Sequence, residues 1–162
     1  MPDDMTEDEL PYLRLQAGYV GRLGVEVGIF VAVDHLRRQS LLTVEEEERY
    51  FDIDDWFQEH LPEPPFYADG NIIGAVTWFK RATTGAMLAR LQPLRDLLKT
   101  HGVRCDLVRA SDPGELVYED AYQVGIVPRV RKPVTPPPPG VTFGPTTAGS
   151  KRHLARRSPK AG

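Results

Sequence analysis

Apolar and polar residues follow strand and helix periods along the chain as far as about residue 127. Residues 12–19 and 103–110 alternate apolar with polar side chains, which is the period of half-buried strands. Residues 28–38 begin with an apolar run and end in cations, which predicts a short buried helix, with a strand over the first half as the alternative. The pattern therefore predicts a body that mixes helices and strands.

The clearest helix start lies at Thr43. Thr43 and Glu46 form a capping-box pattern, in which each side chain accepts a hydrogen bond from the backbone amide of the other residue. The apolar residues that follow recur at helical spacing: Tyr50, Ile53 and Phe57. Because proline cannot continue a helix, Pro62 should end this one.

The second half of the body predicts further strands around a divided helix. Residues 72–79 are typical of a strand or a buried extended segment, and residues 85–100 of a helix that Pro93 kinks or breaks in two. Residues 116–126 share the parity of a final strand or hairpin. Together these elements predict an α+β fold, a single compact domain with helices packed on a largely antiparallel sheet.

Charge divides the chain into two parts. From residue 129 onward there are eight Lys or Arg and no Asp or Glu; of the 20 basic residues this leaves 12 against all 23 acidic ones, so the tail carries +8 and the body −11. We therefore expect an acidic N-terminal extension over residues 1–10, an α+β domain over 11–128 and a disordered, proline-rich basic tail over 129–162.

Several features predict a soluble, cytoplasmic protein with no membrane partner. The N-terminus is acidic where a secretion signal would be basic. The longest apolar run, residues 28–33, is far shorter than the roughly 20 residues of a membrane helix. The single Cys105 has no partner for an internal disulfide and is typical of a small buried apolar side chain.

Four stretches of the body are distinctive: DDWF at 54–57, LPEPPF at 61–66, GAVTWFK at 74–80 and VYEDAYQV at 117–124. They resemble segments of small uncharacterised bacterial proteins from high-GC, actinobacterial-like genomes. The resemblance covers most of the body and none of the tail. It implies one compact bacterial domain, attaches no activity to it and carries over no functional residue.

A candidate anion-binding segment lies just ahead of the helix expected at residues 85–100. It offers two cations and two hydroxyls beside the free amides of a helix start: Lys80, Arg81, Thr83 and Thr84. This arrangement suits a phosphate or a nucleotide, although it lacks the spacing of a Walker loop. The alternative is an ordinary threonine cap with solvated cations.

Acidic and histidine residues give a weaker signal. One cluster lies in the helix expected after Thr43 and has the oxygen ligands that a hard cation prefers: Asp52, Asp54, Asp55, Glu59 and His60. It lacks calcium-loop and zinc spacings, so we expect a solvent-facing helix surface and no metal or cofactor. His35 and His101 have no nucleophile nearby in sequence, so structural roles are expected and no catalytic residue is assigned.

Aromatic side chains around the proline-rich loop are candidates for the wall of a pocket. They are Trp56, Phe66, Tyr67, Trp78, Tyr118 and Tyr122. A pocket with such walls suits a flat ligand or an apolar side chain of a partner. The alternative is ordinary packing in the core.

The tail combines a stiff spacer with a basic end. Residues 133–139 are rich in proline and predict an extended polyproline segment. The cations near the end predict binding to polyanions without sequence specificity: Lys151, Arg152, Arg156, Arg157 and Lys160. The alternative is a solubilising tail that folds onto the acidic body.

Two functional hypotheses follow. The first is a small interaction protein, whose acidic body binds a protein partner and whose tail gives weak, nonspecific binding to nucleic acid or another polyanion. The alternative is a small enzyme or ligand-binding domain that acts on a phosphorylated or nucleotide-like compound at residues 80–85. The sequence leaves open whether there is catalysis, which partner is bound and which oligomeric state is formed.

Overall fold

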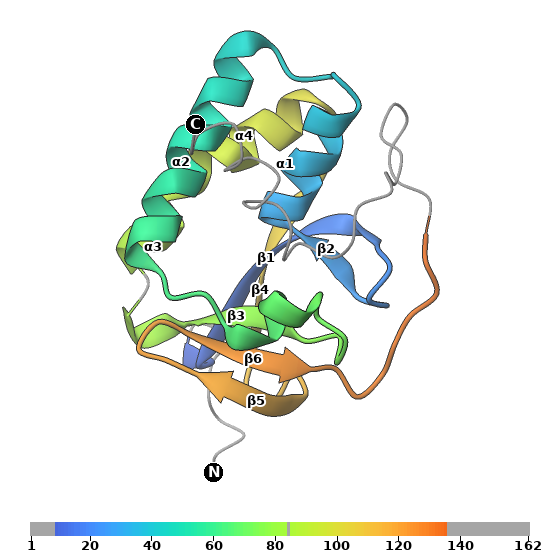
Figure 1. Cartoon of the computed structure of the whole chain (residues 1–162), viewed down its shortest axis with the longest axis vertical. Helices are drawn as coiled ribbons and strands as arrows, with labels where there is room; N and C mark the ends of the chain where they lie inside the picture. The colour runs from blue at the N-terminus through green and yellow to red at the C-terminus, as the bar shows by residue number, and fades with distance from the viewer. Residues whose placement is uncertain (1–8, 84, 136–162) are drawn as a thin grey trace.

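The computed structural model describes residues 9–83 and 85–135 (Figure 1). Within these residues the helices gather at one end of the molecule, and the strands β3, β6 and β5 lie at the other. Residues 136–162, with the five cations near the end of the predicted tail, lie outside the described part, as do residues 1–8. None of the described helices has the length and apolar character needed to cross a bilayer.

The long strand β1 (Tyr12–Val20) is the hub of the sheet. One of its edges pairs with β4 (Cys105–Ala110). The other edge is shared by β3 (Val76–Lys80) near the start of β1 and by β2 (Glu26–Gly28) near its end. A single strand therefore aligns three others.

The sheet continues away from β1 through three strands. β3 pairs with β6 (Gln123–Val127), and β6 pairs with β5 (Glu115–Glu119), which is the last strand on this side. Every pairing in the six-stranded sheet is antiparallel. The predicted α+β fold with a largely antiparallel sheet is therefore confirmed.

Helices and β1 enclose the main core. The helices are α1 (Ile29–Arg38), α2 (Val44–His60), α3 (Gly85–Arg90) and α4 (Gln92–Thr100). Short 3-10 turns precede β3 and α3: η3 (Pro65–Asp69) and η4 (Arg81–Thr83). The core takes buried side chains from β1, α1, α2 and α4, among them Leu15, Val33, Phe57 and Leu94. A second, smaller core comprises Val76, Val124 and Ile126.

Two local predictions about the helices are confirmed. Thr43 Oγ1 accepts from Glu46 N at 3.1 Å and Glu46 Oε1 accepts from Thr43 N at 2.9 Å, so the capping box starts α2. The helix expected over residues 85–100 is divided at Leu91, and Pro93 lies in the first turn of α4. Proline fits there because the first turn needs no backbone donor.

The strand expected from residue 72 begins only at Val76. The Asn71 side chain closes a turn, in which Nδ2 donates to Ala75 O at 2.7 Å and Oδ1 accepts from Ala75 N at 2.8 Å. Asn71 and Gly74 have φ values of 58° and 69°, which strand backbone does not adopt. The sequence prediction is therefore wrong for residues 72–75, which form a loop.

The final predicted strand or hairpin is a hairpin. The Asp120 side chain forms the turn between β5 and β6, because Oδ1 accepts from Tyr122 N at 2.8 Å and from Gln123 N at 3.0 Å. The backbone amide of Asp120 also donates to Gln123 O at 3.0 Å. Carboxylates that accept from amides two and three residues on are common in tight turns.

The first seven residues of the predicted tail, 129–135, lie against the body, and we call them the strap. Lys132 N donates to Gly24 O at 2.7 Å. Val20 N donates to Thr135 Oγ1 at 2.7 Å, and Thr135 N donates to Val20 O at 3.2 Å. The domain therefore extends at least to residue 135, beyond the expected end at residue 128. Charge and proline content do not predict the hydrogen bonds that join Lys132 and Thr135 to the hairpin of β1 and β2.

Candidate functional site

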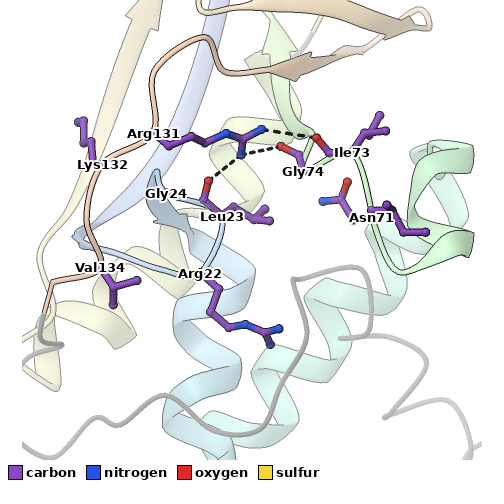
Figure 2. Close-up of a pocket in the computed structure, with 10 residues that line it drawn as sticks. Arg22, Leu23, Gly24, Asn71, Ile73, Gly74, Arg131, Lys132 and Val134 are labelled. Carbon is purple, nitrogen blue, oxygen red and sulfur yellow. Dashed lines mark hydrogen bonds between the residues drawn. The ribbon is translucent and has the colours of Figure 1, made fainter.

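Three segments that are far apart in sequence form an open groove of about 400 Å³. They are the turn between β1 and β2 at residues 22–24, the loop 71–74 and the strap at residues 131–134 (Figure 2). Each of them lies outside a helix or strand, so the groove is built from loops on the edge of the scaffold. Binding residues are often found on loops that a rigid scaffold positions.

The guanidinium of Arg131 holds the three walls together (Figure 2). Its Nη1 donates to Leu23 O at 2.7 Å and to Gly74 O at 3.1 Å, and Nη2 lies 3.5 Å from Ile73 O. A Cβ on Gly24 would come within 2.7 Å of Arg131 Cβ. The close fit requires glycine at that position, and it fixes the strap relative to both loops.

The loop 71–74 directs two isoleucines into solvent. Asn71 is buried, and its side chain closes the loop, whereas Ile72 is 86 % exposed and Ile73 48 % exposed. Val134 of the strap adds a third exposed apolar side chain to the lining of the groove. Exposed apolar side chains that line one groove, rather than lie singly on the surface, are typical of surfaces that a partner covers.

The groove is cationic although the body is acidic. Among the described residues that line it, Arg22, Arg131 and Lys132 are basic and none is acidic. Lys132 Nζ forms an ion pair with Glu26 Oε2 at 2.6 Å, just outside the groove. Partial burial alone would raise the pKa of Glu26, but the hydrogen bond and attraction to Lys132 outweigh it and lower the pKa below its usual value.

The two predicted anion-binding residues whose side chains the structure describes, Lys80 and Arg81, do not converge on such a groove. Lys80 Nζ forms an ion pair with Glu119 Oε2 at 2.6 Å, so it faces β5. Arg81 is exposed in η4, Thr84 and the side chain of Thr83 lie outside the described part, and α3 is only six residues long. Anion binding at this segment stays a prediction that no described contact favours.

The six predicted pocket aromatics lie in several places. Phe66, Tyr67 and Tyr118 are neighbours, with the ring of Phe66 4.8 Å from Tyr67 and 6.3 Å from Tyr118. Trp56 lies at the end of α2, between the guanidinium of Arg90 at 4.0 Å and the ring of His60 at 4.1 Å. Trp78 packs on the smaller core and Tyr122 on the main core. Packing therefore accounts for these contacts.

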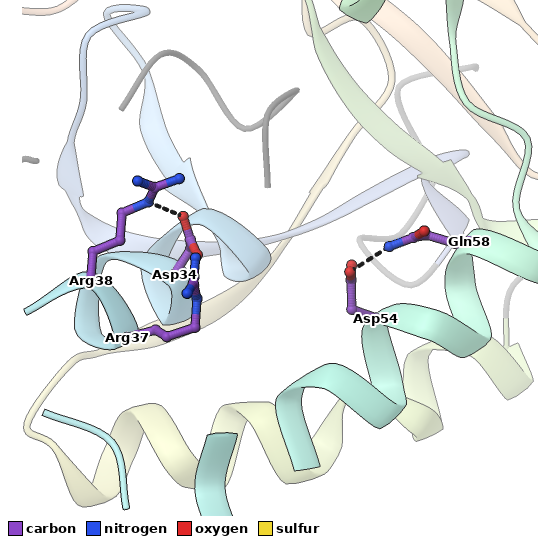
Figure 3. A network of polar contacts seen from close by, with 5 residues as sticks. All are labelled: Asp34, Arg37, Arg38, Asp54 and Gln58. Atoms are coloured by element: carbon purple, nitrogen blue, oxygen red, sulfur yellow. Dashed lines mark hydrogen bonds and ion pairs between the residues drawn. The ribbon is translucent and has the colours of Figure 1, made fainter. Parts of the chain in front are cut away.

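The acidic cluster on α2 is only partly at the surface. Asp52 and Glu59 are exposed, but Asp54 is fully buried and its Oδ2 accepts from Gln58 Nε2 at 2.6 Å (Figure 3). The expected solvent-facing position is therefore wrong for Asp54. In the part of the chain that the structure describes, no group of three or more His, Cys, Asp or Glu is placed to hold a metal ion.

A second buried carboxylate lies on α1, and the sequence analysis did not identify it. Asp34 accepts from Arg38 Nε at 2.7 Å and from Arg37 Nη2 at 2.7 Å (Figure 3). The cations three and four residues after Asp34 were the available signal. This network stabilises the C-terminal turn of α1 and presents no open site.

The histidines and the cysteine have structural surroundings. His35 Nδ1 lies 2.8 Å from Tyr19 Oη inside the core, and burial lowers the pKa of His35. His101 Nε2 lies 3.0 Å from Glu46 Oε1, which joins the end of α4 to the capping box of α2. Burial raises the pKa of Cys105 to about 11, so its thiol is protonated at neutral pH.

The groove itself was missed by the sequence analysis. Its signals are two isoleucines enclosed by Asn71 and Gly74, and Arg131 within the basic run 129–132 that precedes a proline-rich segment. Neither is specific without the structure, since the contacts of Arg131 span 57 to 108 positions along the chain.

The chain matches no protein-family model, no curated protein and no solved structure.

Proposed function

We propose that this protein is a non-enzymatic binding protein whose groove takes a segment of a protein partner that carries both carboxylates and apolar side chains. One observation carries the proposal: the exposed Ile72 and Ile73 line a groove whose described lining also has three cations and no acidic residue. The apolar and cationic parts select complementary parts of a ligand.

The isoleucines favour a protein over a nucleic acid as the partner. Covering an exposed isoleucine side chain is worth roughly 1.5–3 kcal/mol, and a phosphate backbone does not provide that cover. The cations add attraction for carboxylates and exclude basic partners. A short acidic segment with leucine, isoleucine or phenylalanine side chains satisfies both requirements.

The groove is held in shape before any partner binds. The Asn71 side chain fixes the loop that carries the isoleucines, and Arg131 fixes that loop to the strap. A preformed site loses less conformational entropy on binding than a site that must order itself. This supports recognition of a short segment by a small surface.

The predicted basic tail begins beside the groove. Val134 lines the groove, and 15 residues separate Thr135 from Lys151. A chain of that length spans on the order of 20 Å or more, so the tail cations can reach an acidic surface of a partner that occupies the groove. We propose that they add weak, salt-sensitive attraction to nucleic acid or to an acidic protein surface.

The test uses the full chain and a synthetic peptide of alternating glutamate and leucine, with Kd measured by fluorescence anisotropy. Ile72→Ser with Ile73→Ser should weaken binding by about tenfold or more, since a tenfold change needs only about 1.4 kcal/mol. The matched control is Val44→Ser, which removes a 71 % exposed apolar side chain on α2. A peptide with lysine in place of glutamate should lose no affinity in the isoleucine variant, because it does not use the groove.

Three outcomes would overturn the proposal. The first is an equal loss of affinity for the glutamate and lysine peptides in the isoleucine variant. The second is an equal loss in the isoleucine variant and the control. The third is duplex DNA that binds the full chain with the same dependence on Ile72 and Ile73.

A separate variant tests the tail. Replacing the five tail cations by glutamine should reduce the salt dependence of binding to acidic partners. An unchanged slope of log affinity against log salt concentration would remove the tail from the proposal.

A further inference from the structure

The outer edge of β5 is open. β5 pairs with β6, and no other backbone hydrogen bond reaches residues 115–119 from the described part of the chain. Leu116 is 46 % exposed and Val117 41 % exposed, and the register of β5 against β6 shifts between Leu116 and Tyr118. β5 is therefore uncovered on its edge and carries two partly exposed apolar side chains.

The other two edges of the sheet are better protected. The strap donates backbone hydrogen bonds to Gly24 O and Val20 O, which covers the hairpin of β1 and β2. β4 carries the charged Asp106, whose Oδ2 lies 2.9 Å from Nε of Arg104, the residue just before the strand. Natural proteins use such covers and charges to keep edge strands from pairing. β5 stands apart because two exposed apolar side chains, Leu116 and Val117, lie along its open edge.

The charges on β5 define what can pair with it. Glu115 and Glu119 are exposed, and Glu119 also forms an ion pair with Lys80 at 2.6 Å. Asp112, just before the strand, is exposed and paired with Arg129 at 2.9 Å. A second copy of the chain is disfavoured, because antiparallel pairing centred on Val117 would place Glu115 opposite Glu119 of the other copy. Like charges directly opposite each other are destabilising. A basic strand meets the same carboxylates with attraction.

We propose that the edge of β5 binds an extended segment of another protein, in which Lys or Arg alternate with apolar residues, as an added strand of the sheet. Backbone hydrogen bonds to the open edge give the affinity, and the glutamates with Leu116 and Val117 give the preference for basic and apolar side chains. This surface is separate from the groove, which takes acidic segments.

The test measures amide hydrogen exchange of the full chain with and without a synthetic peptide of alternating lysine and valine. We expect slower exchange in residues 115–119 and none of this protection in α2. The same peptide with an N-methyl group on every residue keeps its charge but has no backbone N–H to donate to a strand on either edge. It should give no protection, and equal protection would overturn strand addition.

Matched variants separate the edge from the general acidity of the body. Glu115→Lys with Glu119→Lys should weaken peptide binding by about tenfold, given 0.2–1 kcal/mol for each cross-strand charge pair and the reversal of two pairs. Glu48→Lys with Asp52→Lys makes the same change of net charge at two exposed positions of α2 and should leave Kd within about twofold. Equal losses in the two variants would overturn the proposal.

Two further outcomes would also overturn it by naming a different occupant. In the first, β5 is protected from exchange without peptide, and this protection is lost when the five tail cations are replaced by glutamine. That result would assign the edge to the chain's own tail. Protection that rises with protein concentration would assign it to a second copy. Protection that needs the basic peptide and neither of these supports the proposal.

Discussion

Arg131 Nη1 lies 3.1 Å from the carbonyl oxygen of Gly74, and a Cβ on residue 74 would lie 2.9 Å from the same nitrogen. The side chain can approach the backbone this closely because residue 74 is glycine with a φ of 69°. The strap and the loop that carries the exposed isoleucines are therefore joined by a contact that depends on a missing side chain.

Gly74→Ala should destabilise the protein more than Gly70→Ala does. Both residues have positive φ, so both substitutions cost about 1–2 kcal/mol of backbone strain. A Cβ at Gly70 meets no atom within 4 Å, whereas a Cβ at Gly74 meets the Arg131 guanidinium. Urea denaturation should show about 1 kcal/mol or more of additional loss for Gly74→Ala. Equal losses would mean that Arg131 moves aside without cost.

Arg131→Ala should release the strap. It removes the hydrogen bonds to Leu23 O and Gly74 O, and the expected loss in the free energy of unfolding is about 1–3 kcal/mol. The amides of Lys132 and Thr135 should exchange faster with solvent. Arg129→Ala is the matched control, because Arg129 pairs with Asp112 at an exposed site and should cost less than about 1 kcal/mol. Unchanged exchange at Lys132 in Arg131→Ala would contradict the prediction.

Asp34→Ala should cost more stability than the removal of a surface carboxylate. Asp34 is buried and accepts from two arginines that are partly exposed, so we expect a loss of about 1–3 kcal/mol. Asp52→Ala removes an exposed carboxylate from α2 and should stay within about 0.5 kcal/mol of the native protein. Thermal or urea unfolding measures both, and similar values would show that the α1 network contributes little.

His35 should make stability fall as the pH drops below about 6.5. Burial lowers the pKa of His35 in the folded state, so below its unfolded pKa of 6.5 the unfolded chain binds a proton that the folded chain does not. The slope of up to about 1.4 kcal/mol per pH unit ends at the lowered folded pKa. His35→Gln should remove the slope in this window, and His60→Gln, at an exposed residue, should keep it.

A second loss of stability with acid should occur at lower pH. The pKa of Glu46 is lowered: burial opposes this, but hydrogen bonds from Thr43 and His101 outweigh burial. A carboxylate with a lowered pKa contributes stability that is present above its unfolded value of 4.5 and is lost as the pH falls through the folded value. Urea titrations in steps of pH separate this window from that of His35. An unchanged profile below pH 4.5 in Glu46→Gln would contradict the assignment.

Local chemistry was predictable where it depends on near neighbours in sequence. Thr43 and Glu46 are three residues apart, and Pro93 acts on its own helix, so each fixes structure whatever packs around it. Ile72 and Ile73 resemble the start of β3 in sequence because they are an apolar pair just before its apolar residues. The hydrogen bonds of the Asn71 side chain and the positive φ of Gly74 show that these residues form a loop instead of a strand. Both features depend on the folded backbone.

The groove was beyond sequence reasoning for a different reason. Arg131 was counted as one of the tail cations, yet its guanidinium is used as a hydrogen-bond donor to carbonyls of two distant loops. Asp54 was counted as part of an acidic surface, yet packing buries it beside Gln58. In both cases the sequence shows that the side chain is charged, but only the tertiary structure determines which groups it contacts.

Tyr12 has Lys80 on one side and Ala110 on the other, and Gln16 has Gly28 and Asp106. A one-residue insertion within β1 would turn every later side chain of the strand to the opposite face and break alignment with two neighbouring strands at once. Length variation in natural or engineered versions of this chain should therefore be confined to loops, and β1 is the worst place to introduce a tag or a cleavage sequence.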